Sequence, residues 1–496
     1  MNQKAAVIGA GIGGLAAALR LSKLGYQVTV FESTTKAGGK INEFCHQGFR
    51  FDMGPSLFTL PGMVDELFAL FGKKSGDYIQ YHQLPLIKKY FYEDGLTLNA
   101  WGDPQRFAAE IEAKTHDSAL KVLQYLQHAR EVYALTANNF IFNPFTFSTA
   151  FTREFWRAAL RIRKLNVSKT MHQLNAASFR DPRVVQLFDR YATYNGSDPY
   201  QTPGTLAVIA HLEHNTGAYF PEKGMYQIVE GLFTLAQEQG IIFHFNEQVE
   251  QIKYRNKRVD AVQTAKKTYS FDLAVSDADI FTVYEKLLPS KKIPAAQRKQ
   301  ERSSSALIFY WGIKQRHSEL DVHNILFSAD YKREFEQLFS GKELPADPTV
   351  YIFISAKTVP GDAPAGYENW FVMVNAPSDA GQDWEHSIAL ARQRIISKIN
   401  RILGGDIEKE ILFERHLEPL TIEQNTGSYK GALYGNSSNN RFAAFQRHKN
   451  KTPYFDNLYF VGGSVHPGGG IPLCLSSARM MAEIVKKNKS HEHGKI

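Results

Sequence analysis

The hydrophobic pattern of the first 31 residues predicts two strands separated by a helix. A short apolar run covers Ala5–Ile8, a glycine-rich turn follows, and an alanine-rich segment extends over Ile12–Leu24 before a second strand at Gln27–Phe31. Short apolar runs bounded by turn residues are typical of buried strands, and strands that alternate with helices usually pair in parallel. This segment therefore predicts the opening of a parallel α/β sheet.

The pattern changes twice farther along the chain. From about residue 101 to residue 212 apolar positions recur at helical spacing, whereas the stretch 243–279 alternates apolar and polar residues around a turn at Arg255–Arg258. The alternation predicts a β-meander that ends in the buried strand Leu273–Val275. Later strands are predicted at Ala306–Ile313, Trp370–Val374 and Leu458–Val461, and the last of them leads through a glycine-rich loop into a final helix.

Composition limits the class of protein. A chain of 496 residues is long enough for two or three domains, and its two cysteines, Cys45 and Cys474, are too few for a disulfide scaffold, which predicts a reducing compartment. The segment "MNQKAAVIGAG" enters the glycine turn at once and leaves no room for a signal peptide, and no apolar run reaches the ~20 residues that span a bilayer. We therefore expect a cytoplasmic protein whose membrane contact is peripheral.

Candidate chemistry begins in the first glycine turn, "GAGIGG". Gly9, Gly11 and Gly14 have the G-x-G-x-x-G spacing, in which the glycines allow a tight turn, close approach of a diphosphate and close packing of helix on strand. Glu32 ends the second strand, where a carboxylate accepts hydrogen bonds from ribose hydroxyls. This context predicts a dinucleotide site, and the alternative is a glycine turn that binds nothing.

The residues after Glu32 indicate which dinucleotide binds. In "ESTTKAGGK" the pair Gly38-Gly39 is flanked by Lys36 and Lys40, which gives a second backbone-exposed turn with positive charge around it. Here the chain resembles the two-dinucleotide-binding flavoproteins, and the resemblance implies FAD. The alternative is that the second glycine pair belongs to an ordinary loop.

The glycine-rich loop near the C-terminus, "FVGGSVHPGGGIP", has a different spacing and no acidic strand end after it. Its glycines precede a helix that we expect to begin near Pro472, a residue type favoured in the first turn. Free N–H groups and the helix dipole there would face an electron-accepting group, such as the pyrimidine side of a flavin. The two loops would then hold the two ends of one cofactor; the alternative is a helix N-terminus packed in the core.

Longer stretches carry a resemblance to a family. "FDMGPSLFTLP" (51–61), "GALYGNSSNNRFAAFQR" (431–447) and "NLYFVGGSVHPGGGIPLCLSSARMMAEIV" (457–485) resemble the bacterial-type phytoene desaturase family, the FAD-dependent carotenoid desaturases. The resemblance runs nearly end to end and includes "AVSDAD" at 274–279. Its motifs "ALYG", "SSN" and "GGSVHPGGGIP" are most similar to those of the 1-hydroxycarotenoid 3,4-desaturases. Asp277 stands where the family commonly has Asn, which puts one cofactor contact in question.

From these features we expect an α/β fold with a two-dinucleotide-binding-type, Rossmann-like FAD domain, a mixed-sheet substrate domain and a helical membrane-docking cap. The expected boundaries are 1–85, 219–300 and 415–496 for the FAD domain, 86–100 and 301–414 for the substrate domain, and 101–218 for the cap. The FAD contacts that the resemblance implies are Gly9, Gly11, Gly14, Glu32, Gly39, Lys40, Ser56, Leu57, Val249, Asp277, Leu433, Gly463, Gly468, Gly469, Gly470 and Ile471.

Desaturation needs few catalytic side chains. FAD accepts a hydride, and the second hydrogen leaves as a proton from an allylic cation that is acidic enough to need no strong base. The protein must instead supply a dry, apolar tunnel. The sequence contains no Ser/His/Asp triad and no metal-binding spacing among its 16 histidines. Glu213 and His466 are the candidate ionisable groups, and a hydrogen-bonded structural role is the alternative for each.

The final electron acceptor must come from outside the chain. A second fingerprint, for NAD(P)H, is absent, because Gly404-Gly405 follows a helical segment. The acceptor that we expect is a quinone or oxygen, which members of the family use.

The segment Phe140–Lys164 predicts how an insoluble carotenoid is collected from a bilayer. On a helix from about Thr149, one face is apolar and the other basic: Phe151, Phe155, Ala158 and Ile162 against Arg153, Arg157, Arg161 and Lys164. Such segments lie in the membrane interface, and a net charge of +8 adds attraction to anionic lipid. The alternative is a helix whose apolar face packs on the core. Nucleic acid is a poor match for the same charge, since no recognised binding motif accompanies it.

Three other functions remain open on the same fold. An amine oxidase-like flavoprotein would enclose an amine and could bind FAD covalently through Cys474. A carotenoid isomerase or polyene saturase would act on a similar substrate with different chemistry. A prenyl-lipid carrier would do no redox chemistry, and Glu32 with the Gly38-Gly39-Lys40 element argues against it.

Overall fold

A computed structural model describes residues 3–137, 142 and 165–493. The predicted membrane segment Phe140–Lys164 therefore lies, apart from Phe142, outside the described residues. Within the described part, no helix is long and apolar enough to cross a membrane.

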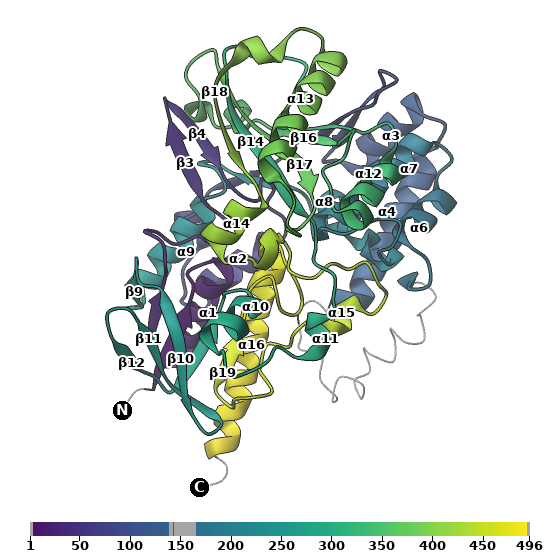
Figure 1. Ribbon diagram of the computed structural model, residues 1–496. Helices are drawn as coiled ribbons and strands as arrows, with labels where there is room; N and C mark the ends of the chain where they lie inside the picture. The colour runs from purple at the N-terminus through teal and green to yellow at the C-terminus, as the bar shows by residue number, and fades with distance from the viewer. Residues whose placement is uncertain (1–2, 138–141, 143–164, 494–496) are drawn as a thin grey trace.

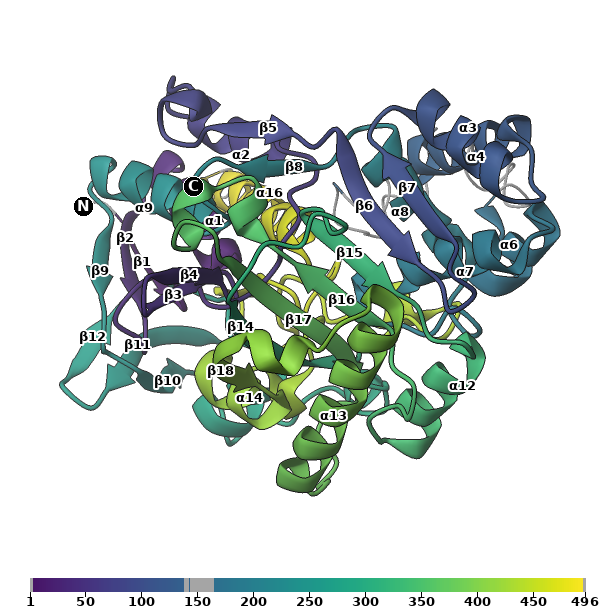
Figure 2. The same cartoon turned by 90° about the horizontal axis from the view of Figure 1, so that it is seen from above.

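A five-stranded parallel sheet forms the lower part of the molecule in Figure 1, and its strands come from both ends and the middle of the chain. The order is β19 (Leu458–Phe460), β13 (Leu273–Ser276), β1 (Lys4–Ile8), β2 (Gln27–Phe31) and β9 (Ile242–His244). The helices α1 (Ile12–Lys23) and α16 (Ile471–His493) lie side by side against this sheet in both views (Figures 1 and 2). The predicted parallel sheet and its first helix are confirmed.

The predicted β-meander needs one correction. β10 (Val249–Arg255), β11 (Arg258–Thr264) and β12 (Thr268–Ser270) form a separate three-stranded antiparallel sheet, whereas β13 belongs to the parallel sheet between β1 and β19. All four residues of β13 are buried, in contrast to the alternating burial of β11. A strand covered on both faces is typical of a parallel sheet and not of the end of a half-exposed meander.

A seven-stranded mixed sheet forms the upper part in Figure 1. Its order is β18 (Ile411–Leu417), β14 (Ser305–Ile313), β17 (Glu368–Ala376), β16 (Val350–Phe353), β15 (His323–Leu326), β6 (Leu86–Phe91) and β7 (Thr97–Trp101). The helix α13 (Trp384–Leu403) covers one face, where its apolar side chains join Trp311, Trp370 and other core residues of the strands. The opposite face joins the core that contains the parallel sheet.

Helices dominate the part of the chain that the sequence predicted to be helical: α3 (Pro104–Lys114), α4 (Ala119–Thr136), α6 (Met171–Ser178), α7 (Pro182–Asp189) and α8 (Val208–His214). They gather at one side of the seven-stranded sheet (Figures 1 and 2). Two of these helices, α3 and α7, begin with residue types that favour a helix N-terminus. Asp103 and Asp181 are their N-cap residues, and each is followed by a proline at the first helical position.

Smaller elements complete the fold. They are the hairpin β3 (Glu43–His46) and β4 (Phe49–Asp52), the pair β5 (Tyr81–Gln83) and β8 (Tyr219–Pro221), and the helices α2 (Gly62–Ala69), α9 (Gln227–Glu238), α10 (Ile280–Thr282), α11 (Ala295–Arg298), α12 (Tyr331–Glu336), α14 (Pro419–Thr426) and α15 (Ala443–Gln446).

The three-domain division stays a proposal. Every strand of the five-stranded sheet falls within 1–85, 219–300 or 415–496, which supports the discontinuous FAD domain. One strand, β18 (Ile411–Leu417), runs across the proposed boundary at residue 414 and pairs with β14 without interruption from Phe413 to Leu417. Continuous pairing favours a boundary after this strand.

Candidate functional site

The first glycine turn connects β1 to α1 at the carboxyl edge of the parallel sheet. Gly9 has φ +98°, and its N–H donates to the carbonyl of Phe31 at 2.8 Å. A Cβ at position 14 would strike the carbonyl oxygen of Gly9, so only glycine allows α1 to begin this close to the strand. Gly11 is the N-cap residue of α1. The turn therefore presents backbone N–H groups and the positive end of the helix dipole at this edge.

Asp277 follows β13 and lies at this same helix N-terminus. A Cβ at Gly11, Gly13 or Gly462 would strike its carboxylate, so the first glycine turn and the segment after β19 both approach this side chain. Burial, with the nearby charge of Glu32, raises the pKa of Asp277 to about 7, against the effect of the N–H groups that favour the ionised form.

Glu32 is held at the end of β2 by four local hydrogen bonds, one of which comes from the Ser33 hydroxyl at 3.2 Å. Its Oε2 accepts the N–H of Ala10 at 2.8 Å, and its Oε1 accepts the N–H and the hydroxyl of Thr34, each at 2.9 Å. The N–H of Glu247 donates to the main-chain carbonyl of Glu32 at 2.9 Å, which brings the start of β10, at Val249, to the same end of the sheet. The predicted ribose and adenine contacts thus lie together.

The second glycine pair lies directly on the first turn. The N–H of Gly38 donates to the carbonyl of Ala10 at 2.9 Å, and Gly39, with φ +58°, would place a Cβ 3.3 Å from the Cα of Gly11. Lys40 extends beyond them and donates from Nζ to the carbonyl of Leu433 at 2.7 Å. Positive charge is thereby fixed near the glycine turns, although burial lowers the pKa of Lys40.

The C-terminal glycine loop closes against the same region. Ile471 is the first residue of α16, and the preceding Gly468, Gly469 and Gly470 form the turn into it. A Cβ at Gly469 would lie 2.9 Å from the Cα of Tyr434, and one at Gly463 would lie 3.3 Å from the Cα of Gly469. These close approaches account for glycine at positions 463 and 469.

Cys474 lies one turn into α16 beneath this loop. It is buried, and burial raises the pKa of the Cys474 thiol to about 12. A thiol that stays protonated is a poor nucleophile, so this environment gives no support to covalent flavin attachment at Cys474.

Ser56 and Leu57 are half-buried in the loop after β4. Their loop reaches the GG-Lys element, because a Cβ at Gly54 would strike the carbonyl oxygen of Lys40. The hydroxyls of Ser56 and Tyr351 lie 2.5 Å apart, which joins the loop to β16 of the seven-stranded sheet. The candidate site therefore lies between the two large sheets.

These residues fit a dinucleotide. Glycine occurs where a Cβ would block the backbone, a helix N-terminus and a lysine supply positive charge, and a carboxylate ends β2. Bound there, FAD would have its adenosine end at Glu32 and Val249, its diphosphate at the first turn, and its flavin near the C-terminal loop. The individual contacts stay predictions.

Glu213, one of the two candidate catalytic groups, lies at the centre of a buried ionic cluster. Its Oε2 is 2.5 Å from Lys88 Nζ, its Oε1 is 3.6 Å from Arg190 Nη2, and the hydroxyl of Tyr191 donates to Oε1 at 3.0 Å. Although burial alone would raise the pKa of Glu213, the charges of Lys88 and Arg190 hold it well below its usual range. A carboxylate paired in this way is a weak base, which favours a structural role.

The partners of Glu213 carry little signal in the sequence. The one signal for Lys88 is a lysine inside the apolar strand "LIKKYF", where it is buried. Nothing in the pattern marked Arg190. These residues come from elements far apart in the sequence, so only the tertiary fold brings them together.

His466, the other candidate, is half-buried in the C-terminal loop. Its N–H donates to the carbonyl of His448 at 2.8 Å, and its carbonyl accepts from Asn450 Nδ2 at 3.0 Å. These bonds fix the main chain beside the glycines, and a catalytic role for the side chain stays a prediction.

Comparison with known proteins gives this site a family. The model of the flavin-containing amine oxidoreductases matches residues 12–486, nearly the whole chain. The chain belongs to that family. It is 48% identical to a 1-hydroxycarotenoid 3,4-desaturase of Flavobacterium sp. (strain P99-3), over 97% of this chain and 99% of that protein. It is also 29% identical to a 4,4'-diaponeurosporene oxygenase of Staphylococcus haemolyticus (strain JCSC1435), over 97% of both chains.

Solved structures of lower identity share the fold. An oxidoreductase from Methanosarcina mazei aligns with a TM-score of 0.62 at 16% identity, over 97% of this chain and all of that chain. A putrescine oxidase aligns with a TM-score of 0.64 at 14% identity, over 98% and 99% of the two chains. The predicted FAD-binding α/β fold, the oxidoreductase class and the FAD cofactor are confirmed at the level of the family, whereas the membrane-docking cap stays a prediction.

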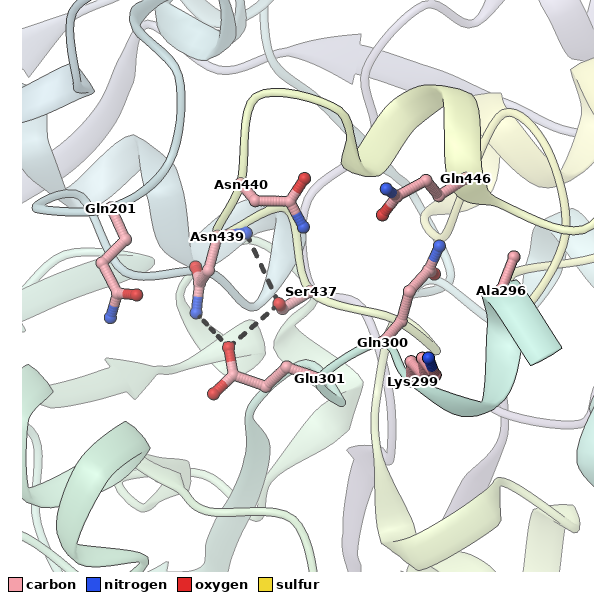
Figure 3. Close-up of a pocket in the computed structure, with 9 residues that line it drawn as sticks. All are labelled: Gln201, Ala296, Lys299, Gln300, Glu301, Ser437, Asn439, Asn440 and Gln446. Atoms are coloured by element: carbon pink, nitrogen blue, oxygen red, sulfur yellow. Dashed lines mark hydrogen bonds between the residues drawn. The ribbon is translucent and has the colours of Figure 1, made fainter.

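The "SSN" motif of this flavin oxidoreductase lines an open pocket of about 530 Å³. Figure 3 shows Glu301 accepting hydrogen bonds from Ser437 Oγ at 3.2 Å and from Asn439 Nδ2 at 2.7 Å. On its other side, Asn439 Oδ1 accepts the N–H of Asp198 at 2.8 Å. The motif thus joins the "YNGSDPY" segment to the residues before β14, and the polar lining of the pocket does not suit an apolar substrate.

The described residues contain no group of three or more His, Cys, Asp or Glu side chains that could bind a metal ion.

Proposed function

We propose that this enzyme introduces a C=C bond into an acyclic carotenoid, at the 3,4 position of a 1-hydroxylated end. The observation that carries the proposal is the 48% identity, over nearly the full length of both chains, to a 1-hydroxycarotenoid 3,4-desaturase. The glycine-rich motif "GGSVHPGGGIP" of the C-terminal loop supports the same subfamily. Oxidoreductase membership argues against the prenyl-lipid carrier.

FAD supplies the two-electron acceptor for such a reaction. The chain would hold its two ends at the glycine turns and leave the reacting side toward the seven-stranded sheet. That face of the sheet is mainly apolar and aromatic, with Ile308, Ile325, Phe353, Phe371 and Met373. A face of this kind excludes water and matches a polyene.

The remaining proton and electrons need no dedicated protein machinery. The proton leaves a carbon next to an allylic cation, so a weak acceptor suffices. The reduced cofactor must then pass its electrons to a diffusing acceptor, for which we propose a quinone or oxygen. In support, Gly404-Gly405 caps the C-terminus of α13 and does not open a second dinucleotide site.

We propose further that the substrate is taken from the cytoplasmic membrane by a peripherally bound enzyme. An acyclic carotenoid partitions into lipid, and the basic, aromatic segment Phe140–Lys164 has the composition of an interfacial helix. Nucleic acid has no part in this function.

The test is to add a 1-hydroxylated acyclic carotene in vesicles to the anaerobic FAD-loaded enzyme. We expect the flavin absorbance to bleach and, once a quinone is supplied, a red-shifted product that has lost two hydrogens. A product that has gained oxygen would favour the oxygenase activity of the Staphylococcus relative. An isomerase or saturase would give no net bleaching by this substrate, and no reaction at all would favour an amine oxidase-like activity.

A further inference from the structure

One polar stripe crosses the apolar face of the seven-stranded sheet that is turned away from α13. The stripe consists of Lys88 on β6, His323 on β15 and Tyr351 on β16. Lys88 and His323 share a face because each directly precedes one member of the pair Lys89 and Asn324 in two parallel strands. Tyr351 lies on the same face because it pairs with Ile325, two residues after His323. Most neighbours on the face are apolar, and Ile325 and Phe353 stand directly opposite Tyr351 and His323 across the β15–β16 ladder. The stripe runs from the ionic cluster of Glu213 to the loop that carries Ser56.

The stripe is hydrogen-bonded at its flavin end. The Tyr351 hydroxyl lies 2.5 Å from Ser56 Oγ and 2.8 Å from His323 Nδ1. The His323 ring is stacked against Phe353, with ring centroids 5.1 Å apart. One hydroxyl therefore fixes both the rotation of the imidazole and its distance from the loop beside the flavin.

His323 keeps one nitrogen without a protein partner. The residue is 1% exposed, and Nε2 has no hydrogen-bond partner among the described residues. Burial, together with the charges of Lys88 and Arg190, lowers the pKa of His323 well below its usual value, so the ring is neutral. A buried polar atom without a partner is unfavourable and rare in folded proteins.

We propose that His323 Nε2 binds the hydroxyl group at the end of the substrate and so selects a hydroxylated carotenoid. This inference rests on the proposed desaturase function. A hydroxyl suits the site in either tautomer, because it accepts a bond when Nε2 carries the hydrogen and donates one when Nδ1 carries it. A hydrocarbon end offers neither bond, and a carbonyl oxygen serves only the first tautomer.

The position of the stripe agrees with the reaction. In a 1-hydroxylated carotenoid the oxygen is two to three carbon–carbon bonds from the 3,4 bond, which is about 3 to 5 Å at ordinary bond lengths. The group that binds the hydroxyl must therefore lie close to the flavin. Two hydrogen bonds, both made by the Tyr351 hydroxyl, connect His323 to Ser56, the residue that the family resemblance assigns beside the flavin.

The experiment compares a 1-hydroxylated acyclic carotene with the same carotene lacking the hydroxyl, both in vesicles, on the FAD-loaded full chain. Because buried polar groups left without a partner penalise the analogue, the parent enzyme should favour the hydroxylated substrate in kcat/KM by about tenfold or more. In His323→Asn the side chain is too short to replace Nε2, so the preference should fall to near unity while kcat/KM for the non-hydroxylated carotene stays within about twofold of the parent. His323→Gln, which can return an amide nitrogen to this place, should recover part of the preference.

Tyr351→Phe should weaken the preference through loss of the ring's anchor, whereas Tyr284→Phe, another buried tyrosine with hydrogen bonds to His448 and Thr452, should leave it unchanged. Binding of both carotenes to each anaerobic, FAD-loaded variant provides a second readout that does not depend on turnover. If His323→Asn folds and keeps the parent's preference in binding and in kcat/KM, the inference is wrong. If the parent enzyme desaturates neither carotene, the proposed desaturase function is wrong. The His323 inference is tested separately by binding, and equal binding of the two carotenes to the parent would show that it is wrong.

Discussion

At the residue scale, Asp277 carries a carboxyl group where the family commonly has an amide. Its raised pKa, about 7 against an ordinary 3.8, means that the folded protein binds a proton there more tightly than the unfolded chain does. The stability that this group contributes is therefore complete below about pH 4 and is lost as the pH rises to about 7.

We expect Asp277→Asn to raise the melting temperature of the flavin-free protein relative to the parent, by about 2 °C or more at pH 8. The advantage should grow between pH 4 and pH 7 and then level off, because the amide does not ionise. Thermal melts across this range give the measurement, and Asp260→Asn, at an exposed position, is the control. A constant difference at every pH would contradict the assignment.

Glu32 gives a second prediction. Since it ends β2 at the proposed ribose site, Glu32→Ala should lower FAD retention at least tenfold while lowering the melting temperature of the FAD-saturated protein little. The flavin-to-protein ratio after gel filtration is the measurement, and the exposed Glu230→Ala serves as the control. Equal flavin content in Glu32→Ala and the parent would rule out a ribose contact.

The two cysteines should differ sharply in reactivity. Cys45 is exposed, whereas burial keeps Cys474 a thiol with a pKa of about 12. We expect iodoacetamide at pH 8 to modify one cysteine in the native protein and both after denaturation, as measured by mass spectrometry. The same spectra should contain no flavin-protein adduct, and an adduct at Cys474 would support the amine oxidase-like alternative.

At the element scale, prediction from sequence worked where the signal is local. The glycine spacing and the apolar run before it defined β1, α1 and β2, because turn and strand requirements lie within a few neighbouring residues. The pairing of β6 with β15 had no such signal, since more than 200 residues separate these strands in the sequence. That pairing creates the polar stripe, so the residues Lys88, His323 and Tyr351 could not be grouped before the fold was known.

The ion pair between β6 and α8 gives the prediction at this scale. Glu213→Gln should destabilise the protein by about 3–5 kcal/mol, because it leaves Lys88 and Arg190 buried without a counter-charge. The double variant Lys88→Met/Glu213→Leu should lose less, since it removes a cation together with the anion. Urea unfolding of both variants tests this, and a Glu213→Gln loss below about 1 kcal/mol would contradict the structural role.

At the scale of the whole molecule, the candidate flavin site exists only because distant segments converge. Residues of the first turn, the segment after β13 and the C-terminal loop all meet at Asp277, although they span nearly the whole chain. The sequence predicts that the two glycine loops hold one ligand, because each loop opens a helix after a strand, and the structure brings residues of both loops to Asp277. The sequence does not predict which side chain lies between them, because the contact depends on how β1, β13 and β19 are ordered in the sheet.

Membrane association is the prediction for the molecule as a whole. The net charge is +8, and replacing Arg153, Arg157 and Arg161 with Glu changes it by six units, from +8 to +2. Each basic residue near an anionic surface contributes about 1 kcal/mol, so the triple variant should be released from vesicles rich in anionic lipid at low salt. Co-sedimentation with these vesicles is the measurement.

A matched variant separates a docking segment from a general effect of charge. Arg255→Glu, Lys257→Glu and Lys314→Glu lie at exposed positions elsewhere and give the same net charge of +2, since 8 − 6 = 2. If the segment Phe140–Lys164 docks on the membrane, this control should co-sediment almost as well as the parent, because its apolar face and local charge are intact. Equal release of both variants would mean that the protein binds lipid through its overall charge. Unchanged co-sedimentation of the Arg153, Arg157 and Arg161 variant would exclude the segment as the docking site.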